Sequence, residues 1–105
     1  MKNGDIPVSQ QPWHPMTNPQ DLKTLGKLGE ELGECQAALM RCLIQGIDEV
    51  EPVTGYMNRH WLEDEIADVQ VNAELVISRF GLDVDRMAQR RAEKKRLLTA
   101  WHREA

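Results

Sequence analysis

Apolar residues recur with a helical period in two long stretches of the chain. The first stretch carries leucines: Leu22, Leu25, Leu28, Leu32, Leu39 and Leu43. The second carries mainly aliphatic residues: Leu62, Ile66, Val69, Ala73, Val76, Ile77 and Phe80. Both sets fit a 3.6-residue period, which is typical of amphipathic helices, whereas no stretch alternates as a half-buried strand would. The pattern therefore predicts an all-α fold.

Residues that favour helix ends bound both stretches and mark a third helix. Asn18 suits the N-cap position and Pro19 the first helical position. Gly46 and Gly81 are typical of the position just past the end of a helix. Asp83 can cap a third, weakly amphipathic helix. The predicted helices span residues 19–45, 58–80 and 84–103.

The N-terminal segment 1–18 differs from the rest of the chain. It contains Gly4, Pro7, Pro12 and Pro15 and has no hydrophobic period, so we expect an extended arm. The chain has 105 residues, a length that favours a single domain.

Two acidic pairs indicate the chemistry of the chain. Glu31 and Glu34 lie three residues apart in the first predicted helix, and Glu65 and Asp68 do so in the second. Residues at this spacing share one face of a helix. If the two faces meet, the four carboxylates repel each other unless a cation lies among them. Oxygen ligands suit Mg²⁺, with Mn²⁺ as its usual substitute, so all four residues are predicted metal ligands.

The acidic pair of the second helix belongs to a longer polar stripe. Its members are Trp61, Glu65, Asp68, Asn72 and Arg79. At 100° per residue they fall within about 60° of each other on the helix surface. We call this set the site stripe, because it would present several candidate groups to one ligand.

Charge is distributed unevenly along a chain whose net charge is −4. Residues 30–74 hold eleven acids and two bases, a net of −9. Residues 84–105 hold seven bases and three acids, a net of +4. An acidic centre beside a basic segment fits a metal–polyphosphate ligand. Taken alone, however, the charge pattern favours the alternative, a solvated basic helix face that pairs with the acids.

Several classes of protein are disfavoured by composition. No apolar run approaches the length of a membrane span, and the N-terminus lacks the apolar core of a signal peptide. We therefore expect a cytoplasmic protein without membrane contact. Cys35 and Cys42 lie too far apart along one helix for a disulfide, and no further soft ligand completes a zinc site.

The acidic clusters resemble those of the MazG-type, all-α nucleoside triphosphate pyrophosphohydrolases. That family carries Glu-Glu-x-x-Glu on one helix and Glu-x-x-Asp on the next. The matching segments here are Glu30-Glu31-Leu32-Gly33-Glu34 and Glu65-Ile66-Ala67-Asp68. The resemblance covers about residues 19–101. The chain departs from the family in the long loop 46–57. The stretch from Glu51 to Glu65 looks like a phage-associated branch of the family.

The resemblance implies Mg²⁺-dependent hydrolysis of an NTP or dNTP to the monophosphate and pyrophosphate. It implies catalytic roles for Glu30, Glu31 and Glu34, with Glu30 orienting or deprotonating water. Glu30 points roughly 100° away from Glu31 around the helix, so a structural role fits it equally well. Arg90 and Lys94 resemble the family's basic phosphate contacts, and either would hold the leaving pyrophosphate.

Two further residues of the site stripe are candidate substrate contacts. Asn72 is placed to bind the sugar or a phosphate, although a polar residue at a subunit interface is the alternative. Trp61 is a candidate for stacking on the base, and packing beside the hydrophobic core is the alternative.

The predicted assembly is a homodimer or a dimer of dimers. One subunit has too few helices to cover both the leucines of the first helix and the site stripe of the second. Packing these helices against their symmetry mates would give a four-helix-type bundle. Gly26, Gly29 and Gly33 would let another backbone approach closely.

Other functions fit the sequence less well. A di-iron protein needs Glu-x-x-His pairs, and the sequence has none. Nucleic-acid binding through the basic third helix is disfavoured by the negative net charge and the lack of a stacking motif. The remaining alternative is a non-enzymatic helical dimer that acts as an interaction or regulatory protein.

Overall fold

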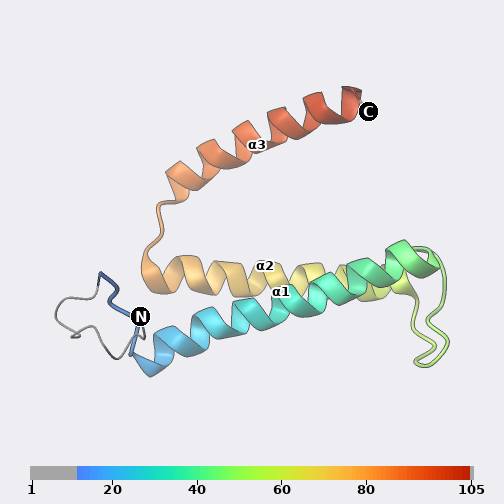
Figure 1. The fold of residues 1–105 in the computed structure, drawn as a ribbon, viewed down its shortest axis with the longest axis horizontal. Helices are drawn as coiled ribbons and strands as arrows, with labels where there is room; N and C mark the ends of the chain where they lie inside the picture. Colours follow the sequence, from blue (N-terminus) through green and yellow to red (C-terminus); the bar gives the residue numbers. More distant parts are fainter. Residues whose placement is uncertain (1–11, 105) are drawn as a thin grey trace, which may run out of the picture.

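The structure is a computed structural model, and it describes residues 12–104. Three helices make up most of this part of the chain (Figure 1). They are α1 (Pro19–Gln45), α2 (Asn58–Phe80) and α3 (Val84–Glu104). Within residues 12–104 the structure has no strand, only an isolated bridge between Val50 and Met57. For residues 12–104, the prediction of an all-α fold with three helices is confirmed.

The helix ends lie close to the predicted positions, and α3 runs one residue further than the sequence indicated. The Asn18 side chain accepts hydrogen bonds from two backbone N–H groups in the first turn of α1, at 2.9 and 3.1 Å. Gly46 and Gly81 have positive φ values of 109° and 58°, which glycine adopts without a steric penalty. Asp83 caps α3 by accepting the N–H of Arg86 at 3.0 Å.

The predicted arm is only partly covered. Residues 12–18 form no regular element. The portion that contains Gly4 and Pro7 lies outside the described residues.

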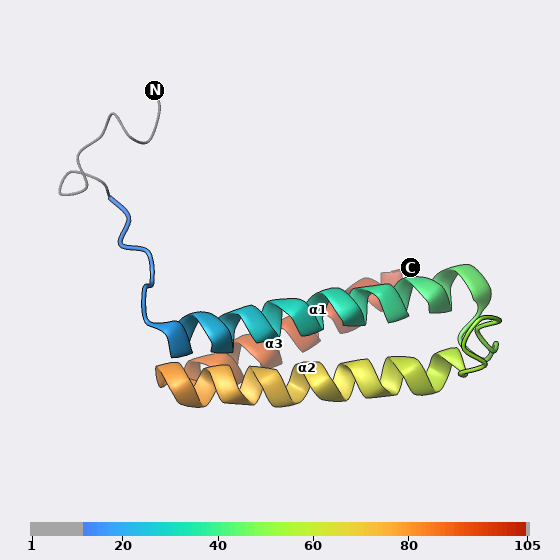
Figure 2. The ribbon, with the colours of Figure 1, turned by 90° about the horizontal axis from the view of Figure 1, so that it is seen from below.

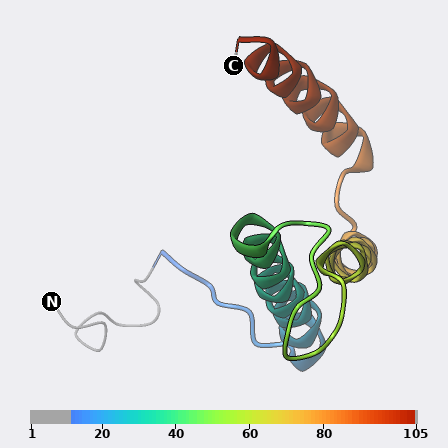
Figure 3. The same ribbon diagram turned by 90° about the vertical axis from the view of Figure 1, so that its right-hand side faces the viewer.

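α1 and α2 form an antiparallel hairpin in which the helices lie side by side (Figure 2). α3 follows a short linker after α2 and runs apart from the hairpin (Figure 3). Extensive contact between helices occurs only between α1 and α2 in the part of the chain that the structure describes. None of these helices combines the length and apolarity that a membrane span requires.

Few side chains are buried in the single chain. Ala38 and Val76, 1% and 7% exposed, are the buried apolar residues of segment 12–104. Three polar residues are buried as deeply: Glu31, Glu51 and Asn58. Because apolar burial is the main stabilising term in folding, this core is small for a chain of such length.

The leucines of α1 are largely exposed instead of forming a core. Leu22, Leu32 and Leu43 are 51%, 52% and 72% exposed. Gly26, Gly29 and Gly33 are equally open, since a Cβ built on each would meet nothing within 4 Å. Leu22, Leu32, Leu39 and Leu43 lie with these glycines within roughly 140° of each other around the helix. We call this surface the leucine face.

Asn58 joins the two ends of the loop 46–57. Its side-chain Nδ2 donates to Gln45 Oε1 at 3.0 Å and to the Gly46 carbonyl at 3.1 Å. Its carbonyl oxygen lies 3.8 Å from Cys42 Sγ. At 1% exposure Asn58 fixes the start of α2 against the end of α1, which sets the register of the hairpin.

Candidate metal centre

Three of the predicted metal ligands converge where the two helices of the hairpin pack together. Glu31 of α1 and Glu65 and Asp68 of α2 each place one carboxylate oxygen within 4.8 Å of the others. The exposure of the three side chains rises from buried Glu31 through half-buried Glu65 to exposed Asp68. The cluster therefore opens from the hairpin interface toward solvent, and a ligand could reach it from that side.

Two carboxylate oxygens in this cluster have no hydrogen-bond partner. They are Glu31 Oε2 and Glu65 Oε2, and both are buried. A buried carboxylate oxygen without a partner is strongly unfavourable, because the charge has lost its hydration. A divalent cation would satisfy both oxygens, and the all-oxygen donor set matches the preference of Mg²⁺. The residues present therefore fit the predicted ion.

Glu34, the fourth predicted ligand, lies at the edge of the cluster. It is exposed, and its oxygens are not part of the group of three. The pKa of Glu34 is raised above its ordinary value, chiefly by the negative charge of Glu31, with burial and the charge of Glu65 adding to the effect. Glu34 thus lies within electrostatic reach of the other acids.

Lys27 partly balances the cluster from one side. Its Nζ lies 3.2 Å from Glu31 Oε1 and 3.4 Å from Glu30 Oε1. The pKa of Lys27 is raised, chiefly by the hydrogen bond to Glu31 and then by the charge of Glu30. Glu30 itself is exposed and outside the cluster, so its catalytic role stays a prediction. Lys27 was not among the predicted site residues, although its spacing of four from Glu31 is a known ion-pair signal.

A groove between α1 and α2 adjoins the acidic cluster. Its lining residues are Gln20, Lys23, Thr24, Lys27, Asn72, Leu75, Ser78 and Arg79. Asn72 Nδ2 donates to the Asp68 carbonyl at 2.8 Å, so the groove begins one helical turn from a predicted ligand. Arg79 forms an ion pair with Asp21 at 2.8 Å. The groove thus offers cationic and polar groups next to the acids, which suits an anionic ligand.

Trp61 contacts a predicted metal ligand and a cationic side chain. Its indole Nε1 donates to Glu65 Oε1 at 3.2 Å. The Arg41 guanidinium carbon lies 4.9 Å from the centre of the indole ring. Arg41 therefore occupies one face of the ring, and stacking on a base stays a prediction for Trp61. The contact to Arg41 crosses from α1 to α2, and no periodicity in the sequence indicated it.

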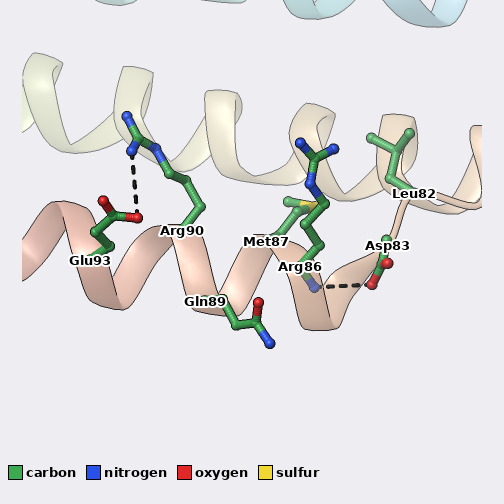
Figure 4. Close-up of a pocket in the computed structure, with 7 residues that line it drawn as sticks. All are labelled: Leu82, Asp83, Arg86, Met87, Gln89, Arg90 and Glu93. Atoms are coloured by element: carbon green, nitrogen blue, oxygen red, sulfur yellow. Dashed lines mark hydrogen bonds and ion pairs between the residues drawn. The ribbon is translucent and has the colours of Figure 1, made fainter.

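The predicted phosphate contacts on α3, Arg90 and Lys94, lie outside the groove next to the acidic cluster. A second groove is lined by Leu82, Asp83, Arg86, Met87, Gln89, Arg90 and Glu93. Arg86 and Arg90 project from α3 toward α2, whereas Gln89 points away (Figure 4). Arg90 lies 3.8 Å from Glu93, and Lys94 lines another groove along α3. No residue of the acidic cluster lines either groove, so one chain does not bring these bases to the acids.

The acidic cluster predicts a measurable effect of metal and of pH on stability. A raised carboxyl pKa in the folded state means that stability falls as pH rises through that pKa and recovers at lower pH. We therefore expect Glu34→Gln to raise the melting temperature of the metal-free protein at pH 7. Mg²⁺ or Mn²⁺ should raise the melting temperature of the wild type, and this variant should lose that rise.

Scanning calorimetry with and without metal measures both effects. Glu74→Gln is the matched control, because Glu74 is an exposed acid on α2 outside the cluster. It should leave the metal response unchanged. A wild-type melting temperature that stays the same with Mg²⁺ and with Mn²⁺ would contradict the predicted metal site.

Comparison with known proteins yields no relative for this chain. No protein-family model matches it, and neither a curated protein nor a solved structure matches it significantly.

Proposed function

We propose that this chain is a Mg²⁺-dependent nucleoside triphosphate pyrophosphohydrolase, which hydrolyses an NTP or dNTP to the monophosphate and pyrophosphate. The observation that carries the proposal is the convergence of Glu31, Glu65 and Asp68 from two helices, with two buried oxygens left without partners. A solvated acidic surface does not require such an arrangement. The two sequence motifs that resemble the MazG-type family supply the same residues.

Each residue near the cluster has a defined part in the proposed reaction. Glu31, Glu65 and Asp68 would hold the ion, and Glu34 would complete the set from its edge. The chemistry that bound Mg²⁺ supplies is neutralisation of phosphate charge and activation of water. Glu30 is the candidate for orienting that water, because it lies beside Glu31 on the solvent side.

The groove next to the cluster supports a phosphate-binding role for that region. Lys27 of α1 reaches Glu31 from one wall of the groove. Asn72, on the α2 wall, donates to the backbone carbonyl of Asp68 one turn earlier in the same helix. A triphosphate lying along this groove would meet Lys23 and Lys27 while its metal-bound end stays at the acids. Charge-assisted hydrogen bonds of this kind position a polyphosphate for in-line attack.

We further propose that two copies of the chain associate through the leucine face of α1. The support is the exposure of leucines in a chain that buries only two apolar side chains among its described residues. An exposed apolar surface of this extent is typical of an interface. A second copy would also offer a surface against which α3 could pack, since α3 makes no extensive contact within one chain. The second copy's own α3 would bring its Arg90 and Lys94, the predicted phosphate contacts.

The activity is tested by pyrophosphate release from the eight common NTPs and dNTPs in the presence of Mg²⁺. We expect the wild type to release pyrophosphate from at least one of them. Glu65→Gln and Asp68→Asn should reduce kcat/KM by roughly 100-fold or more, because each removes a charge that holds the ion. Glu74→Gln, the same kind of change elsewhere on α2, should retain wild-type activity.

Metal binding without pyrophosphate release from any of the eight nucleotides would contradict the proposed activity. The non-enzymatic helical dimer would then be favoured, since the leucine face would still need a partner.

The association is tested by the mass of the protein in solution. Sedimentation equilibrium should give twice the chain mass of 12.0 kDa, or four times that mass for a dimer of dimers. Leu39→Glu places a charge in the leucine face and should shift the protein toward the single-chain mass. Val53→Glu, at a loop position that is 90% exposed, should leave the mass unchanged. A monomeric wild type would contradict the proposed dimer.

A further inference from the structure

The loop 46–57 is tied to the hairpin through a buried carboxylate. Glu51 is only 3% exposed. Its Oε2 accepts the backbone N–H groups of Val53 at 3.0 Å and Thr54 at 2.7 Å. Its Oε1 lies 3.2 Å from Arg41 Nη1. Both oxygens are thus satisfied, and the carboxylate holds the loop and the Arg41 side chain in one arrangement.

Arg41, which is held by Glu51, also contacts the ring of Trp61. Its guanidinium carbon lies 4.9 Å from the centre of the indole ring, within the range of a cation–π contact. The other end of the guanidinium is held by Glu51. Arginine suits this position because its planar group can stack on a ring and pair with a carboxylate at the same time. The indole is therefore fixed from the side of the loop.

Trp61 in turn fixes one of the metal ligands. Its Nε1–H group donates to Glu65 Oε1 at 3.2 Å, across one turn of α2. The second oxygen of the same carboxylate, Oε2, is buried and has no partner. An N–H donor that holds one oxygen sets the rotation of the carboxylate and so decides where the other oxygen points. Such outer partners orient ligands in many metal sites.

We infer that Trp61 is a positioning residue for the metal ligand Glu65, and that Arg41 and Glu51 link the loop 46–57 to the metal site through its indole ring. The inference rests on the proposed function, because it requires that the acidic cluster binds a metal. On this inference, the loop 46–57 helps to orient the Glu65 carboxylate. It also differs from the predicted stacking role of Trp61, which requires only an aromatic surface and no N–H group.

Trp61→Phe separates these roles, because phenylalanine keeps an aromatic ring under Arg41 and removes the N–H donor. Mn²⁺ affinity is measured by calorimetric titration without nucleotide. We expect the variant to bind Mn²⁺ roughly 10- to 100-fold more weakly than the wild type, the range typical for loss of an outer partner. Trp101→Phe is the matched control, since Trp101 is 60% exposed on α3, and it should bind Mn²⁺ like the wild type.

A second variant reports on the intact contact. Replacing Trp13 and Trp101 by phenylalanine leaves Trp61 as the single tryptophan of the chain. Its fluorescence should change during Mn²⁺ titration with the midpoint found by calorimetry. Glu51→Gln in this background should alter the Trp61 emission and weaken Mn²⁺ binding, because the loop end of the network loses its charge.

The outcomes distinguish this inference from the proposed function. A wild type that does not bind Mn²⁺ would overturn both. Wild-type Mn²⁺ affinity in a folded Trp61→Phe protein would overturn the positioning role and leave the metal site standing. If that variant does not fold, the single-tryptophan protein supplies the test. Unchanged Trp61 emission while Mn²⁺ binds would overturn the positioning role in the same way.

Discussion

Repulsion between carboxylates is the constraint around which this hairpin is arranged. Glu31, Glu65 and Asp68 come together at the surface where α1 and α2 pack, a place where apolar side chains would stabilise the fold more. Lys27 offsets part of the charge through one oxygen of Glu31, and Trp61 satisfies one oxygen of Glu65. The second oxygen of each glutamate remains buried without a partner. Such a site would lower the free energy of unfolding of the metal-free protein, and a bound cation would raise it again.

The small core follows from the same arrangement. α1 presents Glu31 and Ala38 to α2, so its leucines point elsewhere and remain exposed. One side of a helix cannot face both a metal site and a partner chain. In α1 the acidic residues of the site lie on one side and the leucine face lies on the opposite side. The acidic side brings Glu31, Glu65 and Asp68 together within one chain. The leucine face is available for a second copy, which would supply the apolar burial that the hairpin lacks.

Much of the local structure could be predicted from the sequence. Asn18, Gly46 and Gly81 end helices through effects that act within a few residues, so their positions were accessible from the pattern alone. The spacing of the acids indicated that each pair shares one helix face, whereas the meeting of the two faces was a condition that the spacing alone did not supply. Which acids lie innermost did not follow, because it depends on the rotation of each helix about its axis.

Contacts that depend on the path of the loop were not predictable. Glu51, Arg41 and Trp61 come from a loop and two helices, and no periodicity relates them. The position of α3 was equally inaccessible. Its apolar residues are sparse, so the sequence indicates a helix there without indicating which surface it packs against. Arg90 and Lys94 accordingly lie away from the acids in the single chain.

A crystal grown with Mn²⁺ and measured for anomalous scattering tests the central claim most directly. The account predicts an anomalous peak between the carboxylates of Glu31, Glu65 and Asp68, within coordination distance of the two oxygens that now lack partners. The same hairpin with no peak at these carboxylates, at a Mn²⁺ concentration that saturates ordinary magnesium sites, would contradict it.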